Sequence, residues 1–291
     1  MRVATAAYGM EIMTSWAQYE DKIAEWVCEA AEEGAEMLVF PEWSAIELAT
    51  LAGPDMARDV EASLFAVSER FEHANAIHAQ LAAEHRVYIL GGSGFVATSQ
   101  RPVNRAHFFA PSGAVATQDK QIMTRYERDV MRLQPGAPLR LFETCLGRIG
   151  VLICYDVEFP LLGRALSECD VLLVPSVTES LHGYWRVRIG AMARALESQC
   201  VTVMASLVGE APWSEAADTS TGMGGVFGPP DKGFPPSGVI AEGAVNQAGW
   251  TYADIDLSAI ANVRQDGTVL GRQHWSEQYG RDCVAHVVEL R

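Results

Sequence analysis

The chain has few basic side chains for its length. Its 291 residues include 22 Lys and Arg against 37 Asp and Glu, which gives a formal net charge of −15 at pH 7. A protein of this sign repels both nucleic acid and anionic membrane surfaces. We therefore expect neither of them as a main partner.

The sequence also lacks the patterns of common metal and cofactor sites. Its six cysteines form no C-x-x-C pair, and its seven histidines show no metal-ligand spacing. No glycine-rich loop matches a phosphate-binding pattern. We expect no metal, no cofactor and, because the cysteines need not form disulfides, a reducing compartment.

Long apolar runs are absent as well. No stretch approaches the roughly 18 apolar residues that span a bilayer. The first residues, "MRVATAAYGME", reach an acid at Glu11 without a long apolar core, unlike a signal peptide. The prediction is a cytoplasmic protein.

What the sequence has is an alternation of apolar strands and amphipathic helices. This pattern predicts an α/β or layered fold, and the absence of a long linker predicts a single domain over residues 1–291. Strands are expected at 2–8, 37–40, 87–95, 105–110, 114–120, 148–154, 170–176 and 201–208, and helices at 16–33, 61–84, 160–168 and 184–199.

Two segments break this alternation. Residues 210–243 are rich in Gly, Pro, Ser and Asp, which predicts surface loops around short strands. Residues 263–291 are polar, with one β-like run, "CVAHVVEL", at 283–290.

Three of the apolar strands end in chemically reactive side chains. Glu42 follows "MLVF", Lys120 ends "AVATQDK", and Cys154 ends "GVLIC". A carboxylate can accept the thiol proton and return it to a leaving amine, and an ammonium can stabilise an oxyanion. Together the three residue types suit acyl transfer from nitrogen through a thioester.

Three motifs that contain these residues resemble those of the nitrilase superfamily of carbon–nitrogen hydrolases. They are "FPEW" at 40–43, "DKQIMTRYE" at 119–127 and "CYDVEFP" at 154–160, in the family's order and spacing. "DVLLVPS" and the later "ARALESQ" also fit, and the resemblance covers the chain from Arg2 to about Asp256.

The resemblance implies a role for each matching residue. Glu42 would be the general base, Cys154 the nucleophile, and Lys120 with the backbone N–H of Tyr155 the oxyanion donors. Glu127 is the best match for a second glutamate that helps to position substrate. The implied fold is a four-layer α-β-β-α sandwich, commonly paired into homodimers or larger homo-oligomers.

Further residues are candidates for contact with substrate. Trp43 and Tyr155 flank the proposed base and nucleophile, and Thr178 and Glu179 follow the strand "VLLVP". Arg186, Arg188 and Arg194 could hold a substrate carboxylate, or they could pair with acids such as Glu197.

The reaction predicted from these features is hydrolysis of a small amide to an acid and ammonia or an amine. Tyr155 and Asp156 follow the nucleophile, as in amidase-like branches, whereas true nitrilases typically have Trp-Glu there. Alternatives are an acyltransferase with an amine acceptor, a nitrile hydrolase, a papain-like pairing of Cys154 with His182, and a non-catalytic interaction protein.

Overall fold

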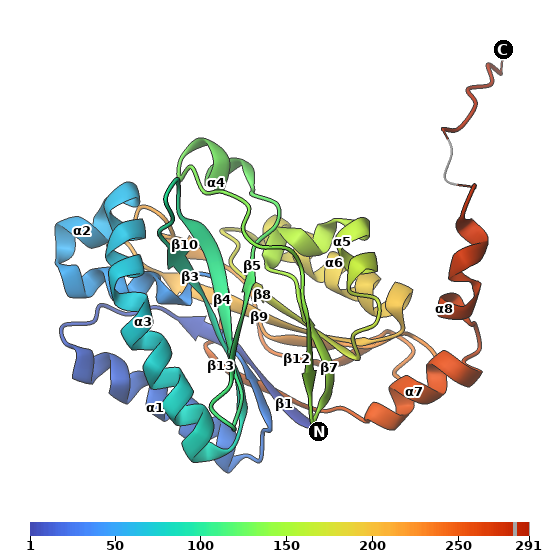
Figure 1. Ribbon diagram of the computed structural model, residues 1–291, viewed down its shortest axis with the longest axis horizontal. Helices are drawn as coiled ribbons and strands as arrows, with labels where there is room; N and C mark the ends of the chain where they lie inside the picture. The colour runs from blue at the N-terminus through green and yellow to red at the C-terminus, as the bar shows by residue number, and fades with distance from the viewer. Residues whose placement is uncertain (282–283, 291) are drawn as a thin grey trace.

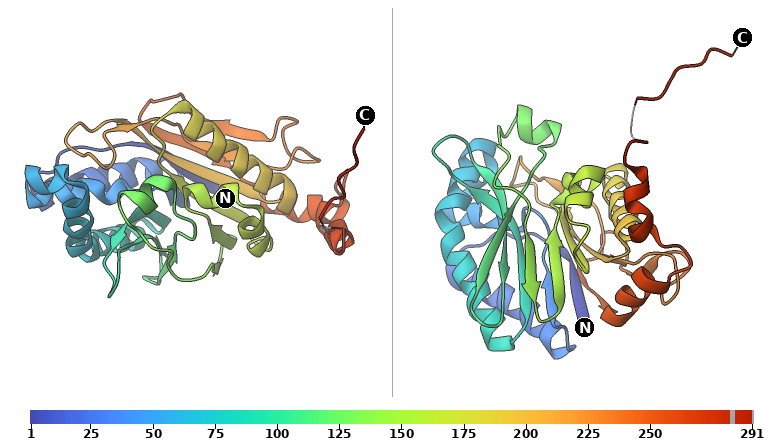
Figure 2. Two further views of the ribbon diagram at one scale, coloured as in Figure 1. Left: turned by 90° about the horizontal axis from the view of Figure 1, so that it is seen from above. Right: turned by 45° about the vertical axis from the view of Figure 1, so that its right-hand side comes forward.

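The elements of the protein form four layers. The computed structural model describes residues 1–281 and 284–290. In the right-hand view of Figure 2, α1 and α3 lie on one side, strands fill the middle, and α5 and α6 lie on the other side. The predicted α-β-β-α sandwich is confirmed.

The strands form two sheets that are joined at one place. β1 and β9 pair in parallel only through Ala7–Gly9 and Ser206–Val208. The first sheet has the order β5-β4-β3-β2-β1-β13, and the second β6-β7-β8-β9-β11-β12. The strands of the first sheet are β1 (Arg2–Gly9), β2 (Met37–Val39), β3 (Tyr88–Val96), β4 (Val103–Phe109), β5 (Val115–Asp119) and β13 (Gly249–Asp254). The strands of the second sheet are β6 (Leu141–Thr144), β7 (Gly147–Val151), β8 (Val171–Ser176), β9 (Val201–Glu210), β11 (Gly225–Phe227) and β12 (Val239–Glu242). The short strand β10 (Thr219–Ser220) pairs with β9.

Helices cover the outer face of each sheet (Figure 1). α1 buries Tyr19, Ile23, Val27 and Ala30, spaced three or four residues apart, against the first sheet. This spacing places them on one helical face, as predicted. The helical segments are α1 (Trp16–Glu32), η1 (Ser44–Ala52), α2 (Pro54–Arg58), α3 (Val60–His85), α4 (Arg125–Asp129), η2 (Cys154–Glu158), α5 (Pro160–Ala165), α6 (Leu181–Ser198), α7 (Leu257–Asp266), α8 (Gly271–His274) and η3 (Trp275–Gln278).

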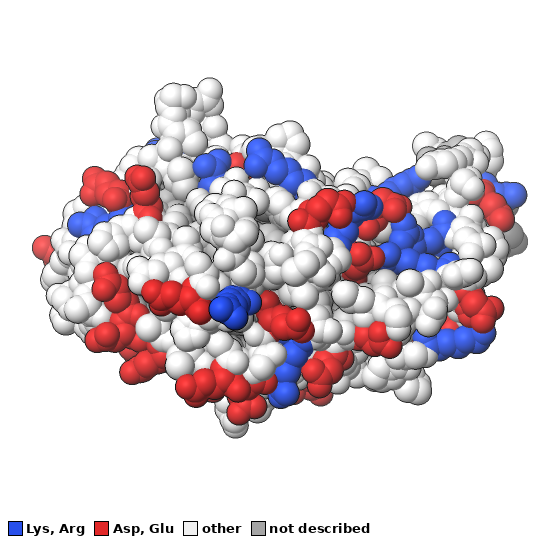
Figure 3. All heavy atoms as spheres, turned by 60° about the horizontal axis from the view of Figure 1, so that its bottom comes forward, with Lys and Arg blue, Asp and Glu red and all other residues white. Residues whose placement is uncertain are grey.

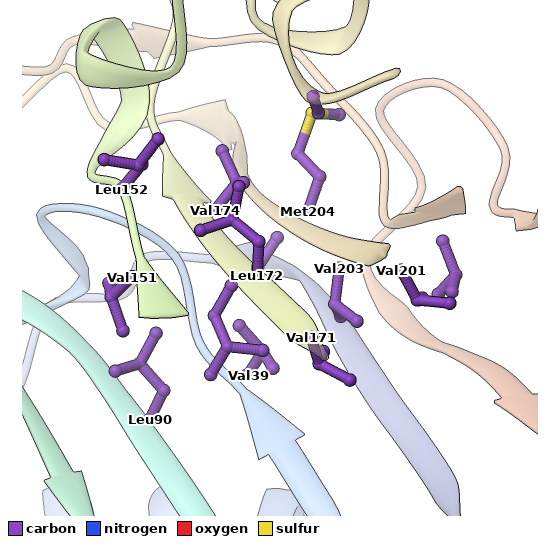
Figure 4. Packing of buried hydrophobic residues seen from close by; sticks show 14 of the residues in the cluster. Val39, Leu90, Val151, Leu152, Val171, Leu172, Val174, Val201, Val203 and Met204 are labelled. Carbon is purple, nitrogen blue, oxygen red and sulfur yellow. The ribbon is translucent and has the colours of Figure 1, made fainter. Parts of the chain in front are cut away.

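Aliphatic side chains fill the space between the sheets. Figure 4 shows Val39 and Leu90 of the first sheet pointing toward Val151 and Leu172 of the second. All four are almost fully buried. The two sheets are therefore held face to face by a continuous apolar layer, with β2, which precedes Glu42, on one side and β7, which precedes Cys154, on the other.

Three sequence predictions need correction. The strand expected at 148–154 ends at Val151, and Cys154 begins the turn η2. Residues 221–229, expected in surface loops, are buried. The β-like run at 283–290 has no regular structure over 284–290, and Cys283 lies outside the described residues.

Acidic side chains are spread over the face shown in Figure 3, with Lys and Arg side chains among them. This distribution agrees with the net charge of −15. Within residues 1–281 and 284–290, no helix combines the length and the apolar character needed to cross a bilayer.

Candidate active site

Glu42 lies in a turn that follows β2 and packs on β3. Ser93 holds this turn, donating its backbone N–H to Pro41 O (3.2 Å) and accepting from Trp43 N through its hydroxyl (3.2 Å). The register of β3 shifts between Leu90 and Ser93, and Gly92 within this stretch has a φ of +77°. A Cβ there would lie 2.4 Å from Pro41 O. Glycine is therefore needed for the turn to approach the strand.

Lys120 follows β5, and its backbone is fixed from the neighbouring strand. Its N–H donates to Asn104 O (2.9 Å). Just before it, Asp119 lies opposite Arg105 in the β4–β5 ladder and accepts two bonds from that guanidinium (2.6 and 2.9 Å). A bidentate pair of this kind holds the end of β5 in one geometry.

Cys154 occupies the first position of η2, three residues after β7 ends. Its φ of +50° lies in the left-handed region, which costs a residue with a side chain about 1–3 kcal/mol. The first hydrogen bond of this turn runs from Asp156 N to Ile153 O (3.1 Å). The N–H of Tyr155 thus lies in the first turn of a helical segment, where donors have no partner within the segment.

Asp156 connects this turn to the segment that follows Lys120. Its carboxylate accepts from Gln121 N (3.1 and 3.2 Å) and from Ile122 N (2.8 Å). Burial raises the pKa of Asp156 to about 7, against the opposing effect of the Lys120 charge and these N–H groups. The nucleophile and the lysine are therefore positioned by one shared contact.

The side chains of Glu42, Lys120, Glu127 and Cys154 converge at the ends of these elements. Lys120 Nζ donates to Glu42 Oε1 (2.8 Å) and to both oxygens of Glu127 (2.8 and 2.7 Å). Asn104 Nδ2 donates to Glu42 Oε1 (2.8 Å). Lys120 is 1% exposed and Cys154 5%. The two carboxylates thus share one buried ammonium, and the Cys154 thiol lies in the same buried cluster, with Val177 O 3.5 Å from its sulfur.

Burial and neighbouring charges set the protonation of this cluster. Burial raises the pKa of the Cys154 thiol well above its usual value, and the Glu42 charge adds to this rise while Lys120 opposes it. Burial also raises the pKa of Glu42, opposed by Lys120 and reinforced by Glu127. The pKa of Lys120 is raised because Glu127 and Glu42 outweigh its burial. These shifts favour a thiol at Cys154 and an ammonium at Lys120 in the resting cluster.

A cleft of about 720 Å³ ends on these residues. It is lined by Trp43, Tyr155, Thr178 and Glu179, which the sequence predicted as substrate contacts. Its outer walls come from residues 124–130, 177–187 and 215–219, which lie at the upper end of Figure 1.

The other polar residues considered from the sequence divide between the cleft and the structure around it. Of the three arginines, Arg186 lines the cleft. Arg188 pairs with Glu242 (2.6 Å), and Arg194 pairs with its predicted local partner Glu197 (3.2 Å). His182 is exposed and is not part of the cleft wall.

Two contacts of Glu42 were missed from the sequence. One is Asn104, which shares a face of β4 with the buried Ala106 and Phe108. A polar residue among apolar ones on a buried strand face indicates a specific hydrogen-bond partner, so this contact could have been predicted. The other is the backbone N–H of Val177, which donates to Glu42 Oε2 (3.2 Å). A backbone donor leaves no mark in the sequence.

Glu127 lines the cleft and contacts both Lys120 and the start of α4. Both of its oxygens contact Lys120, and Oε2 also accepts from the backbone N–H of Thr124 (2.8 Å), the residue that caps α4.

Among the described residues, no group of three or more His, Cys, Asp or Glu side chains could hold a metal ion.

Known proteins match this chain over most of its length. The family model for carbon–nitrogen hydrolase matches residues 4–265. The chain is 31% identical to the probable hydrolase YhcX of Bacillus subtilis, covering 92% of this chain and 52% of that protein. It therefore spans about half the length of this relative.

Two further similarities concern amidases. Omega-amidase NIT2 of Xenopus tropicalis is 26% identical, with 81% of this chain and 82% of that protein covered. A solved structure of an amidase variant from Nesterenkonia sp. AN1 superposes with a TM-score of 0.68 at 18% identity, covering 97% of each chain. That structure has the acetamide moiety of fluoroacetamide added covalently at the active-site cysteine.

Proposed function

The chain belongs to the carbon–nitrogen hydrolase family, and we propose that it hydrolyses the C–N bond of a small amide through a thioester on Cys154. One observation carries this proposal. Glu42, Lys120 and Cys154 meet at the closed end of a cleft, with Lys120 Nζ 2.8 Å from Glu42 Oε1. The covalent adduct on the cysteine of the Nesterenkonia amidase supports the choice of nucleophile.

The first half of the reaction forms the thioester. Glu42 accepts the Cys154 proton as sulfur attacks the amide carbonyl, so the raised thiol pKa is overcome only when substrate is in place. Lys120 Nζ and the Tyr155 N–H donate to the oxyanion. Glu42 then returns the proton to the amide nitrogen, and ammonia or an amine leaves as the C–N bond breaks.

The second half releases the acid. Glu42, again a carboxylate, accepts a proton from water, and the resulting hydroxide attacks the thioester carbonyl. The same two donors stabilise the second tetrahedral intermediate, which expels the sulfur of Cys154. The proton held by Glu42 returns to that sulfur. The cycle consumes one water and changes no oxidation state.

Glu127 acts in this proposal through Lys120. Its two oxygens hold the ammonium between itself and Glu42, so it is a positioning residue and does not form or break a bond. The buried negative charge also keeps Lys120 protonated, since it raises the pKa of the ammonium.

An amide is preferred over a nitrile as substrate. Tyr155 and Asp156 follow the nucleophile in the amidase-like pattern, and a base that can return a proton suits the expulsion of a poor nitrogen leaving group. The test is ammonia release from small amides, each compared by kcat/KM with the nitrile that has the same side chain. Faster turnover of the nitriles across several pairs would overturn the assignment.

We also propose that the protein acts as a homo-oligomer in a reducing cytoplasm. The exposed face of α6 carries Leu181, Trp185, Ile189 and Leu196, spaced as one apolar stripe. Gly183, Arg186 and Val187 of the same helix line the cleft, so a second copy placed on the stripe would lie close to the site. Free cysteines, with none of those described in a disulfide, suit a reducing compartment.

A further inference from the structure

Carboxylates dominate the outer wall of the cleft. Beyond the buried cluster, the lining includes Asp129, Glu158, Glu179, Glu215 and Asp218, against the two guanidinium groups of Arg125 and Arg186. Three negative charges are therefore in excess at the mouth.

The two arginines are already engaged by part of this set. Arg125 pairs with Asp129 (3.3 Å), and Arg186 pairs with Glu158 (3.4 Å). The excess charge is thus concentrated on the remaining acids, Glu179, Glu215 and Asp218.

These three acids come from two separate segments and meet near Tyr126 of α4. The Tyr126 hydroxyl donates to Glu215 O (3.1 Å), which ties α4 to the segment that carries Glu215 and Asp218. Burial raises the pKa of Tyr126, and the charges of Asp218, Glu215 and Glu179 raise it further. Glu215 has Arg58 as a partner (3.4 Å), whereas Glu179 and Asp218 form no ion pair with any residue that the structure describes.

A second feature, at the inner end of the cleft, points independently to a bound ligand. Trp43 lines that end and is 7% exposed, and its indole N–H has no acceptor among the described residues. A buried donor without a partner costs free energy. An acceptor atom on a bound ligand would satisfy it.

From this arrangement we infer that the substrate is an amide with an ammonium group at its far end, held by Glu179 and Asp218 while the amide lies at Cys154. The inference rests on the proposed amide hydrolysis and adds the charge of the substrate. An ω-amide that ends in a carboxylate would bring a like charge to the same acids and be repelled.

The test compares three amides with the same tetramethylene chain: δ-aminovaleramide, hexanamide and adipamate, which end in an ammonium, a methyl and a carboxylate. We expect kcat/KM to follow this order, with about tenfold between the cation and the neutral amide, because two exposed charge pairs each contribute a few-fold. The preference should shrink as salt is added.

Variants locate the preference. Glu179→Gln with Asp218→Asn should reduce the ratio of cationic to neutral kcat/KM to near one. Glu72→Gln on α3, an exposed acid that does not line the cleft, should leave this ratio unchanged. A ratio that survives the double variant, or a wild-type preference for adipamate, would overturn the inference.

A second measurement separates this inference from the proposed function. Chloroacetamides that carry the same three ends alkylate a cysteine without turnover, so their rates at Cys154 report charge preference alone. If no amide is hydrolysed but the cationic reagent labels Cys154 fastest, the proposed function fails and the charge preference stands. Equal labelling rates with all three reagents would overturn the charge preference.

Discussion

Cys154 and Trp43 share an uncommon backbone conformation, with φ angles of 50° and 60°. Residues with side chains avoid this left-handed region unless the surrounding structure imposes it, and such strain tends to collect at active sites. Here it turns the chain abruptly after β2 and after β7. The proposed base and nucleophile leave their strands at these turns and reach the same cleft.

The first prediction at this scale concerns Glu42 and Lys120. Glu42→Gln and Lys120→Met should each lower kcat/KM by several orders of magnitude, and the double variant little further, because residues that act as one unit are not additive. Glu47→Gln is the matched control: Glu47 forms another buried pair, with Lys22 (2.8 Å), outside the cleft. It should lower thermal stability while kcat/KM stays within a few-fold. Modest, additive losses from Glu42 and Lys120 would contradict their joint role.

Glu127→Gln tests the electrostatic part of the cluster. Burial raises the pKa of Glu42, and the Glu127 charge raises it further. Removing that charge lowers the Glu42 pKa, so the carboxylate survives to lower pH. The acidic limb of kcat/KM against pH should therefore shift to lower pH, with a reduced maximum because Lys120 is held less firmly. A limb that stays in place or moves upward would show that Glu127 has no charge effect on the base.

At the scale of elements, the site depends on a connection between two short segments. The carboxylate of Asp156 in η2 accepts the backbone N–H groups of Gln121 and Ile122, which follow Lys120. Both N–H groups lie within hydrogen-bond distance of Oδ1, and that of Gln121 also reaches Oδ2 (3.1 Å), so one oxygen can serve both donors.

This geometry predicts opposite outcomes for two substitutions of Asp156. Asp156→Ala leaves two half-buried donors without this acceptor and should lower the free energy of unfolding by about 2–4 kcal/mol, with a large loss of activity. Asp156→Asn keeps an acceptor oxygen and should retain most of the stability. Urea unfolding of both variants measures the difference. Equal losses in Ala and Asn would mean that these hydrogen bonds do not hold the segments together.

The strands and helices that were predicted correctly have strong periodicity of their own. The missed ones depend on tertiary partners. β13 has a mostly half-buried pattern without clear alternation and is held by pairing with β1. The segment at 221–229 looks like a loop because of its glycines, yet a Cβ at Gly222 would lie 2.5 Å from that of Ser206. Glycine at this position permits close packing of the backbone. The composition of the segment alone does not distinguish such a packed segment from a turn.

The site was predictable where reactive residue types end apolar strands. Glu42, Lys120 and Cys154 were found this way, because each stands out from the strand before it. The environment of these residues was not predictable. The carboxylates near Tyr126 belong to segments that lie about 35 to 90 residues from one another and from Tyr126 in the sequence. Only the folded chain brings these segments together.

At the scale of the whole molecule, the apolar stripe on α6 is a feature that the folded chain leaves uncovered. Ile189, at its centre, is 62% exposed. Contiguous exposed apolar side chains of this kind mark interaction surfaces. A self-complementary face on one helix suits a two-fold dimer.

Light scattering after gel filtration tests this surface. The wild-type chain should elute as a dimer or larger, and Ile189→Glu should shift it toward monomer because it places charges in the apolar contact. Val115→Glu, at a residue 52% exposed on β5, is the control and should leave the mass unchanged. A monomeric wild-type protein would contradict the proposal.

The central claim, amide hydrolysis through a thioester on Cys154, is tested most directly by trapping the intermediate. The enzyme is mixed with a turned-over amide, quenched in acid within the first turnovers, and digested for peptide mass mapping. The account predicts that the peptide containing Cys154 gains the mass of the acyl group, and that Cys154→Ala neither gains this mass nor releases ammonia. Continued ammonia release by Cys154→Ala, or an acyl group on another residue, would contradict the account.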